Sequence, residues 1–333
     1  MKKEKDIVGL GEMMLRLTAP RGRLIPDAGE FQASYGGGEA NVLISLSHLK
    51  HKCVYLSRLP IDDLGNACKK KLLAHEVDCS NIIHDHHSFG MYFVDIAEGS
   101  RSSNTLYNRK HSSASHMKPT DFDFDKIFAN AEMFYLTGIT LAISKEARET
   151  ALLALKKAKE HGVKVIFDFN YRSRLLSLDD AKKIYPLVID YCDVVFASPF
   201  DFKTLLNFEP EETDDDKLFF DAMKHYKLDR VYTKHRKIIA SNEHILNGIA
   251  YTKDGKYESG EMNCLIYDRI GAGDAYAAGV IHGYLKGYNE EKTLCLGIAN
   301  AILKQSLFGD YAKFNESTLL DFIASKGKGE IKR

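Results

Sequence analysis

The sequence predicts an α/β fold in which helices cover both faces of one mainly parallel sheet. Short apolar segments of strand character alternate along the chain with segments whose apolar residues recur at helical spacing. Residues 133–168 contain a complete strand–helix–strand unit, the arrangement that joins parallel strands. The 333 residues, of which 44% are hydrophobic and 28% charged, can build one large core. We therefore expect a single domain over residues 1–333.

The N-terminal part of the chain supplies two strands and two helices. Ile7–Leu10 and Cys53–Leu56 are apolar runs of strand length. Between them, Gly38–Leu49 places leucine and isoleucine residues at the spacing of one helix face. A second helix is expected over Asp62–Ala74, because either of its first two residues, both aspartate, can cap a helix N-terminus.

The strand–helix–strand unit has the clearest boundaries. Met133–Leu136 is the first strand, and Ser144 is the expected N-cap of the helix that follows. Gly162 ends that helix where glycine is favoured, and Val163–Phe167 is the second strand. The apolar face of the helix consists of Ala147, Ala151, Leu152, Leu155 and Ala158.

The alternation continues toward the C-terminus. Strands are expected at Asp193–Ala197 and Arg230–Thr233. The last helices are expected near residues 271–286, 290–306 and 316–325. Ligands of open parallel sheets bind beyond the carboxyl ends of the strands, so we expect the site at that edge. The basic tail, 326–333, is expected to fray.

Two stretches, residues 13–35 and 89–109, interrupt this pattern. Both show strand-like alternation, as in Met91–Ile96, and the turn-like residues 98–100 lie within the second stretch. We interpret them as strands outside the main sheet that form a small lid. The lid also suggests a homo-oligomer, with subunits paired through apolar residues such as Leu15, Leu17 and Phe93.

Composition narrows the partners and the compartment. Lys plus Arg and Asp plus Glu both number 46, and this zero net charge favours neither a nucleic-acid nor a membrane-surface partner. No apolar run approaches the ~18 residues of a membrane span. The six cysteines form no CxxC pair, and the chain opens without the features of a signal peptide. We therefore expect reduced thiols in a cytoplasmic protein.

The segment DRIGAGDAYAAG, residues 268–279, has the composition of a phosphate site. Gly271–Gly273 enters a helix, and small residues let the N–H groups of a helix N-terminus point at an anion. Asp274 follows in the first turn, where the helix dipole favours its ionised form, and it could accept a hydroxyl proton as kinase aspartates do. Alternatively, Asp274 is only a favourable N-terminal acid and the glycines only pack closely.

Three motifs resemble those of ribokinase-like (PfkB-type) carbohydrate kinases, and they follow one another along the chain in the same order as in that family. Asp268 with Gly271–Asp274 resembles the signature DxxGAGDxF, with tyrosine in the aromatic place. Residues 35–41 resemble the sugar-binding segment G-G-x-x-x-N, through Gly36, Gly37 and Asn41. Residues 168–172 resemble a D-x-N-x-R segment. The resemblance covers nearly the whole chain.

The resemblance implies a three-layer α/β/α sandwich with a small β-sheet lid. It implies that Asp274 is the general base and that the amides of Gly271, Ala272 and Gly273 form the anion hole. It also implies ATP and Mg²⁺ as cofactors and leaves open a monovalent cation.

The substrate is expected to carry a carboxylate. Guanidinium groups bind carboxylates through two parallel hydrogen bonds, and the chain offers Arg109 after the second lid stretch and Arg172 after a central strand. Both positions resemble those of 2-keto-3-deoxygluconate kinases, as do Tyr92, Tyr107 and Asp310. The resemblance implies ATP-dependent phosphorylation of the 6-hydroxyl of 2-dehydro-3-deoxy-D-gluconate. It does not separate the gluconate from the galactonate form.

Two segments depart from the family pattern. Residues 233–238 replace a glycine-containing loop beneath the nucleotide, so Lys234 or Arg236 is either a phosphate contact or part of a solvated basic turn. Where the family often has N-x-x-E, this chain has Ser198 and Asp201, so Asp201 is expected to hold Mg²⁺ through water. The expected ATP contacts are Asn170, Ser198, Thr233, Lys234, Arg236, Gly271 and Gly273.

Three other functions remain open at this point. A fructose, ribose or nucleoside kinase of the same fold would not need the pair of arginines. A non-catalytic sugar or nucleotide sensor would fit the altered 233–238 segment but has no use for Asp274 as a base. A nicotinamide dehydrogenase is suggested only by Gly9 and Gly11, since Met14 stands in place of the third glycine of that fingerprint.

Overall fold

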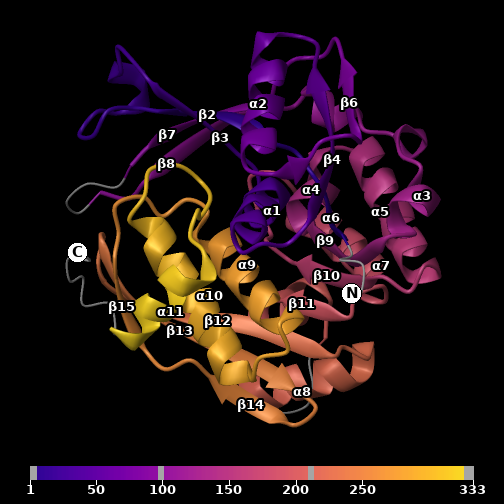
Figure 1. Cartoon of the computed structure of the whole chain (residues 1–333), viewed down its shortest axis with the longest axis vertical. Helices are drawn as coiled ribbons and strands as arrows, with labels where there is room; N and C mark the ends of the chain where they lie inside the picture. Colours follow the sequence, from indigo (N-terminus) through magenta and orange to yellow (C-terminus); the bar gives the residue numbers. More distant parts are fainter. Residues whose placement is uncertain (1–5, 97–100, 209–213, 326–333) are drawn as a thin grey trace.

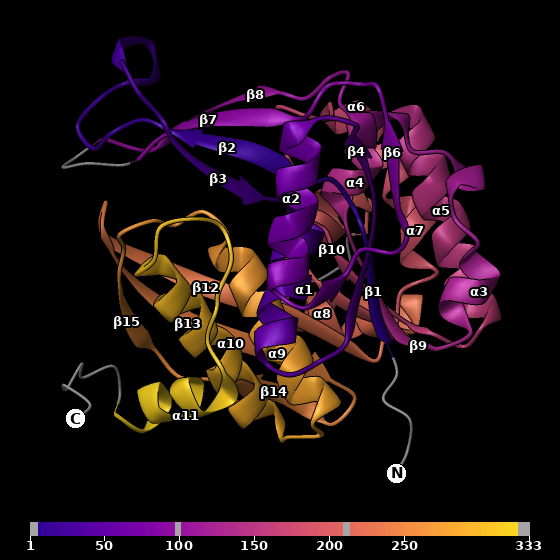
Figure 2. The ribbon, with the colours of Figure 1, turned by 45° about the horizontal axis from the view of Figure 1, so that its top comes forward.

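The structure is a computed structural model that describes residues 6–96, 101–208 and 214–325. The expected turn at 98–100 and the expected frayed tail at 326–333 lie outside these residues. The remaining chain forms one main sheet of 11 strands and one separate sheet of 4 strands. Figures 1 and 2 show the second sheet projecting from one side of the main body.

The main sheet is parallel through its centre, as predicted. Its order is β14-β13-β12-β11-β10-β9-β1-β4-β5, with β15 paired to β13 and β6 to β4. The pairs from β12 to β5 are parallel, whereas β13, β14 and β15 are antiparallel. The strands are β1 (Asp6–Leu10), β4 (Cys53–Pro60), β5 (Val77–Asp78), β6 (Ile82–Asp85), β9 (Ala131–Thr137), β10 (Lys164–Asp168), β11 (Val194–Phe196), β12 (Arg230–Ala240), β13 (Glu243–Thr252), β14 (Gly255–Glu258) and β15 (Met262–Leu265).

Helices cover both faces of this sheet. The helices are α1 (Gly38–His48), α2 (Asp63–Ala74), α3 (Phe124–Phe128), α4 (Gly138–Ile143), α5 (Lys145–Glu160), α6 (Leu178–Ile184), α7 (Pro186–Ile189), α8 (Asp215–Tyr226), α9 (Ala272–Leu285), α10 (Glu290–Gln305) and α11 (Glu316–Ala324). Ser144 caps α5 and Asp62 caps α2 through side-chain bonds to backbone N–H groups, as expected.

Alternation along the strands separates two cores. Val8 and Phe134 belong to the cluster that packs against α3, α5 and α8, whereas Ile7 and Tyr135 belong to the cluster with α1, α9 and α10. Successive side chains of a strand point to opposite faces, so these two clusters lie on either side of the sheet. The predicted three-layer α/β/α sandwich is therefore confirmed (Figure 1).

The separate sheet confirms the predicted lid strands. Its order is β3-β2-β7-β8, built from β2 (Met14–Thr18), β3 (Gln32–Gly36), β7 (Met91–Asp95) and β8 (Asn104–Asn108). Leu15, which we expected to be available for pairing between subunits, is 7% exposed and packs in the core cluster beside α1. That expectation was wrong because β2 is buried on both faces at this end, where Met14 and Arg16 are buried as well.

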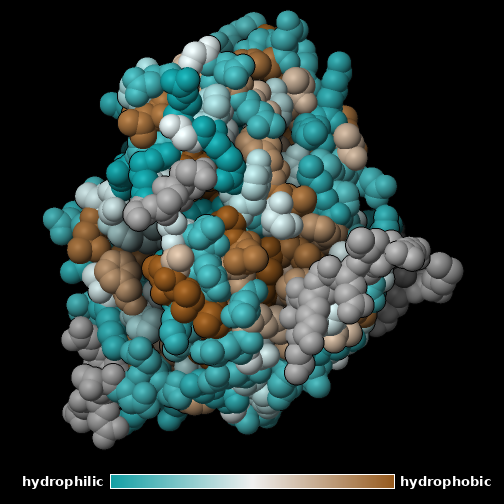
Figure 3. Space-filling model, turned by 90° about the vertical axis from the view of Figure 1, so that its left-hand side faces the viewer, coloured by the Kyte–Doolittle hydropathy of each residue, from teal (hydrophilic) through white to brown (hydrophobic). Residues whose placement is uncertain are grey.

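The homo-oligomer itself stays a prediction. The lid keeps two exposed apolar residues on β8, namely Leu106 and Tyr107. Figure 3 shows that hydrophobic side chains gather near the centre of the molecular face on the side that carries the lid and β15. Within the described residues, no helix has the length and apolar character needed to cross a membrane. All six cysteines, which belong to the described residues, are free thiols.

The interpretation of residues 233–238 as a loop was wrong. They belong to β12, which runs to Ala240 and pairs with β13 in a long antiparallel hairpin, with Thr233 opposite Ile249 and Lys234 opposite Gly248. The residues beyond Thr233 are exposed, so no local apolar pattern marked the strand. Its hydrogen-bond partner, residues 243–252, stabilises it instead.

Candidate active site

Asp274 lies in the first turn of α9 and interacts electrostatically with Asp168, the last residue of the central parallel strand β10. Its Oδ2 accepts a hydrogen bond of 2.7 Å from Nδ2 of Asn41, a residue of α1. Oδ1 of Asn41 accepts the backbone N–H of Gly37 at 3.2 Å. The structure thus brings together two motifs that lie more than two hundred residues apart, and Asn41 fixes the orientation of the carboxylate.

The turn before α9 has the geometry expected of an anion site, with one exception. Gly271 is the N-cap with φ of 79°, a left-handed conformation that favours glycine. The N–H groups of Gly271 and Gly273 take no protein acceptor within the described residues, so they can bind an anion. The N–H of Ala272 instead donates to the Arg269 carbonyl at 3.2 Å. The structure therefore supports Gly271 and Gly273 in the anion hole better than Ala272.

Asp274 has a higher pKa than its position at a helix N-terminus suggested. Burial is the largest cause, and it raises the pKa of this 9% exposed residue to about 6. The hydrogen bond from Asn41 and the charge of Arg172 lower the pKa, while Asp168 raises it further. At neutral pH the carboxylate is still mostly ionised, and a base with this pKa is well matched to proton transfer near neutrality.

The segment after β10 contributes Asp168, Asn170 and Arg172. Burial raises the pKa of Asp168 to about 6, opposed by Lys234 and Arg172. Asn170 has φ of 40°, and its backbone N–H donates to Asp168. Arg172 acts electrostatically on both Asp168 and Asp274, so it belongs to the same site. Asp168 was quoted in the motif but not expected as a functional residue, although an acid at the end of a central parallel strand is a recognisable signal.

The two basic residues of β12 have different surroundings. Nζ of Lys234 lies 4.9 Å from the ring centroid of Tyr276. A Cβ placed on Gly273 would lie 3.7 Å from the same Nζ. The carbonyl of Thr233 accepts the hydroxyl of Tyr276 at 2.8 Å. Lys234 keeps accessible surface, but the protein around it removes hydration from the ammonium group and lowers its pKa. The charges of Asp168 and Asp274 oppose this shift by raising the pKa. Arg236 is exposed further along the hairpin, so Lys234 is the better placed for a phosphate.

Ser198 and Asp201 lie close together at the end of β11. The backbone N–H and the hydroxyl of Ser198 both donate to Oδ2 of Asp201 at 2.7 Å. Burial raises the pKa of Asp201, and Asp201 in turn raises that of Asp168. No group of three or more metal-ligating side chains occurs among the described residues. Because Mg²⁺ in kinases uses one or two carboxylates with phosphate oxygens and water, Asp201 and Asp168 still fit this ion.

The lid contributes an aromatic pair and a shared acid. Tyr92 of β7 donates its hydroxyl to Oδ2 of Asp310, and its ring stacks on Tyr107 of β8 with 5.6 Å between centroids. A Cβ on Gly36 would lie 2.0 Å from the same oxygen of Asp310, so only glycine fits there. The structure therefore brings together Gly36, Tyr92, Tyr107 and Asp310, as the sequence predicted.

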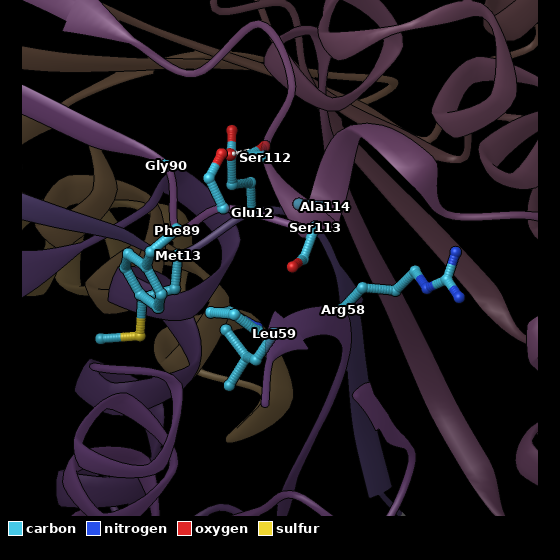
Figure 4. A pocket seen from close by; sticks show the side chains of 11 residues that line it. Glu12, Met13, Arg58, Leu59, Phe89, Gly90, Ser112, Ser113 and Ala114 are labelled. Atoms are coloured by element: carbon cyan, nitrogen blue, oxygen red, sulfur yellow. Dashed lines mark hydrogen bonds between the residues drawn. The ribbon is translucent and has the colours of Figure 1, made fainter. Parts of the chain in front are cut away.

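Arg109 lies beside Glu12 with 9% of its side chain exposed. Its Nη2 pairs with Oε2 of Glu12. Figure 4 shows Glu12 beside Ser112, whose hydroxyl donates to Oε1 of Glu12. The backbone oxygen of Glu12 lies 2.0 Å from where a Cβ on Gly37 would be. Glu12, the partner of Arg109, therefore packs directly against the segment that contains Asn41. Nε of Arg109 has no hydrogen-bond partner within the described residues. Buried donors without a partner are rare in folded proteins, so this nitrogen requires an explanation.

Sequence reasoning missed four further buried charges around this site: Glu12, Arg16, Asp268 as an ion-pair partner, and Lys304. Arg16 and Lys304 are fully buried, and each contacts Asp268. Lys304 could have been found, because it falls on the otherwise apolar face of α10, one turn after Ala301. Arg16 gave no such signal, since strands commonly alternate charged with apolar residues.

The raised pKa values predict a defined loss of activity in acid. If Asp274 is the general base, as the sequence predicts, it must be ionised to accept a proton, so kcat/KM should fall about tenfold per pH unit below about pH 6. Asp168 titrates in the same range and interacts with Asp274, so the measured pKa belongs to the pair. The test is the pH profile of kcat/KM between pH 8 and pH 5, and a flat profile would contradict this assignment.

Acid unfolding is a poor alternative explanation for such a profile. A carboxyl group whose pKa is raised by folding binds its proton more readily in the folded state, so it adds stability as the pH falls toward its unfolded pKa. Asp168 and Asp274 both have raised pKa values. We therefore expect circular dichroism over the same pH range to show no loss of secondary structure that follows the titration of these two groups.

Known proteins match the chain over nearly its whole length. A model of the pfkB family carbohydrate kinases matches residues 4–313. A 2-dehydro-3-deoxygalactonokinase of Haloferax volcanii is 29% identical over 92% of this chain and 93% of its own length. A 5-dehydro-2-deoxygluconokinase of Geobacillus thermodenitrificans is 30% identical over 90% of this chain and 87% of its own length.

A solved structure adds the fold. The 2-dehydro-3-deoxygluconokinase of Thermotoga maritima superposes with a TM-score of 0.92 at 30% identity, covering 97% of this chain and 99% of that one. The predicted ribokinase-like fold and the predicted carbohydrate-kinase class are confirmed. With the family model extending from the first strand of the sheet to beyond Asp310, the chain belongs to the pfkB family of carbohydrate kinases.

Proposed function

We propose that this kinase transfers the γ-phosphoryl group of ATP to the 6-hydroxyl of 2-dehydro-3-deoxy-D-gluconate. The observation that carries the proposal is the position of Asp274, held by Asn41 of α1 and adjoining the open amides of Gly271 and Gly273. A base and an anion site in one turn suit the transfer of a phosphoryl group to a hydroxyl.

The residues divide the chemistry between them. Asp274 accepts the hydroxyl proton as that oxygen forms its bond to phosphorus, and the bond to ADP breaks. Amides at the N-terminus of α9 and the ammonium of Lys234 stabilise negative charge on the phosphoryl oxygens. ATP and Mg²⁺ are typical cofactors of this family. Asp201 and Asp168 would hold Mg²⁺, which would supply further charge neutralisation when bound.

The carboxylate end of the substrate is assigned to arginine. Arg109 pairs with Glu12 and keeps one nitrogen, Nε, without a hydrogen-bond partner among the described residues, and Arg172 lies within electrostatic reach of Asp274. The relatives named above act, by their names, on deoxygenated keto sugar acids. These acids share a carboxylate and differ in the positions of the keto group, the deoxy carbon and one hydroxyl.

Other functions have less support. A kinase for neutral sugars has no carboxylate for Arg172 to bind, although Arg172 lies within electrostatic reach of Asp274. A sensor gives no reason to hold a base with a pKa of about 6 beside open amides. The glycines that suggested a dehydrogenase have a packing role, because a Cβ on Gly11 would lie 2.2 Å from the carboxylate of Glu39.

The direct test is to incubate the protein with Mg²⁺-ATP and a panel of acceptors, and to measure ADP release. The panel contains 2-dehydro-3-deoxygluconate, 2-dehydro-3-deoxygalactonate, 5-dehydro-2-deoxygluconate, fructose and ribose. We expect the highest kcat/KM with the first acid, and phosphorus NMR should find the product phosphate on carbon 6. Preference for a neutral sugar would overturn the sugar-acid assignment, and turnover of none of them would favour the sensor.

Removing one guanidinium should weaken binding of the acid selectively. Arg109→Ala is expected to raise KM for the keto acid by about 10- to 100-fold while changing KM for ATP less than about threefold, because a hydrogen bond to a charged group contributes roughly 1.5–3 kcal/mol. The matched control is Arg101→Ala, since Arg101 is another lid arginine and pairs with Asp95. Equal increases in both KM values would contradict the role of Arg109.

A further inference from the structure

Two fully buried cations lie next to the anion-binding turn without belonging to the predicted site. Arg16 comes from lid strand β2 and Lys304 from α10, and both side chains are 0% exposed. Burying a charge is unfavourable unless partners compensate for the lost hydration, so lysine and arginine are almost never fully buried unpaired. Their partners therefore indicate what these charges do.

Arg16 joins two acids that are distant in sequence. Its Nη2 lies 2.7 Å from Oδ2 of Asp268, and its Nη1 donates to Oδ1 of Asp310 at 2.8 Å. Its Nε donates to Thr18 at 2.9 Å, and the guanidinium carbon lies 5.1 Å from the ring centroid of Phe308. A planar fork that contacts two carboxylates fixes their relative position, which a single ammonium could not do.

Asp268 and Asp310 in turn shape the anion-binding turn. Oδ1 of Asp268 accepts the N–H of Ile270 at 3.1 Å, and its Oδ2 accepts the N–H of Gly309 at 3.1 Å. The backbone oxygen of Asp310 lies only 1.5 Å from where a Cβ on Gly271 would be. Any displacement of Asp310 therefore moves or releases Gly271, whose amide is one of the open donors.

Lys304 holds Asp268 from the opposite side. Its Nζ donates to the backbone oxygen of Asp268 at 2.9 Å and lies 3.9 Å from Oδ1. Two buried cations thus face two buried acids, so the turn is electrically balanced. Burial by itself would lower the pKa of Arg16, but Asp310 and Asp268 raise it overall. Burial lowers the pKa of Lys304, opposed by the same two acids.

We propose that Arg16 and Lys304 are positioning residues, which set the anion-binding turn and couple it to the lid through Asp268 and Asp310. The lid reaches Asp310 twice, through Arg16 of β2 and through Tyr92 of β7. Movement of the lid onto a sugar is therefore transmitted to Gly271, and the amides reach their working positions when the acceptor is bound. The kinetic part of this proposal rests on the proposed function.

The main test is Arg16→Lys, which keeps a positive charge and removes the fork. We expect kcat to fall about 10- to 100-fold, with KM for ATP changed less than about threefold, because a small misplacement of reacting groups costs rate rather than binding. Arg230→Lys is the matched control, since Arg230 also pairs with an acid, Glu290, at 2.6 Å. Arg230 is the first residue of β12 and precedes the site residues Thr233 and Lys234. That control should keep the wild-type kcat.

Hydrogen exchange supplies a readout that does not depend on turnover. In Arg16→Lys and in Lys304→Met, a peptide over residues 268–276 should exchange its amides about tenfold faster than in the wild type, whereas a peptide over β9 should not change. If no acceptor supports turnover by the wild type, the substrate assignment fails while this measurement still tests the coupling.

A double-variant cycle separates positioning from general stability. If Arg16 acts through Asp268, then Arg16→Lys combined with Asp268→Asn should lower kcat about as much as the more severe single change. Multiplicative losses would overturn the shared role. An unchanged kcat in Arg16→Lys with unchanged exchange at 268–276 would also overturn it, as would a loss of thermal stability with normal kcat per folded molecule.

Discussion

Asp274→Asn is expected to lower kcat by about 10²- to 10⁴-fold, the range that a positioned general base contributes. Asparagine has nearly the same shape, and its side-chain oxygen can still accept the 2.7 Å hydrogen bond from Asn41. The change therefore removes the proton acceptor without removing the contact that orients it. KM for ATP and for the acid should change much less than kcat.

The measurement is steady-state ADP release under saturating Mg²⁺-ATP and acceptor, with acid binding followed by calorimetry. Asp216→Asn is the matched control, because Asp216 also lies in the first turn of a helix, α8, and accepts a hydrogen bond from Tyr251. The control should keep full activity. Undiminished turnover by Asp274→Asn would remove the basis of the proposed mechanism.

Gly271→Ala is expected to lower kcat by at least about 10²-fold, the effect of losing one donor of an oxyanion site. A Cβ at this position would lie 1.5 Å from the backbone oxygen of Asp310, so the turn must shift. The left-handed φ of 79° adds strain for any residue other than glycine. Both effects displace the amides to which we assign the phosphoryl group.

Gly162→Ala separates the clash from the strain. Gly162 also has a left-handed φ, 66°, but a Cβ there would meet nothing within 4 Å. We expect a stability loss of about 1 kcal/mol in Gly162→Ala, from the backbone alone, with kcat unchanged. A similar kcat in the two variants, measured per folded molecule, would contradict the proposed position of Gly271 in the anion site.

Local signals in the sequence were sufficient for the central layers. Ser144 caps α5 and Gly162 follows it, as the spacing predicted, because caps depend on residues within one helical turn. The place of Gly271 and Asp274 at the N-terminus of α9 was also predicted, since a glycine-rich turn that enters a helix is a local structure, whereas their roles stay predictions.

Contacts between distant residues were not predictable in this way. The hairpin of β12 and β13 was missed because exposed residues 234–240 gain their strand conformation from a partner strand. Arg16 and Asp268 lie more than two hundred residues apart, so only the folded chain reveals their ion pair. The raised pKa of Asp274 has the same origin, since burial depends on elements that pack around α9.

The carboxylate of Asp310 binds the lid residues Arg16 and Tyr92, and its carbonyl oxygen packs against Gly271 of the turn. A chimera that receives the lid of another kinase would therefore have a mismatched turn unless Arg16 and Tyr92 were retained at their positions in the new lid. Acceptor preference and catalytic power are for this reason traits that protein engineers must alter jointly.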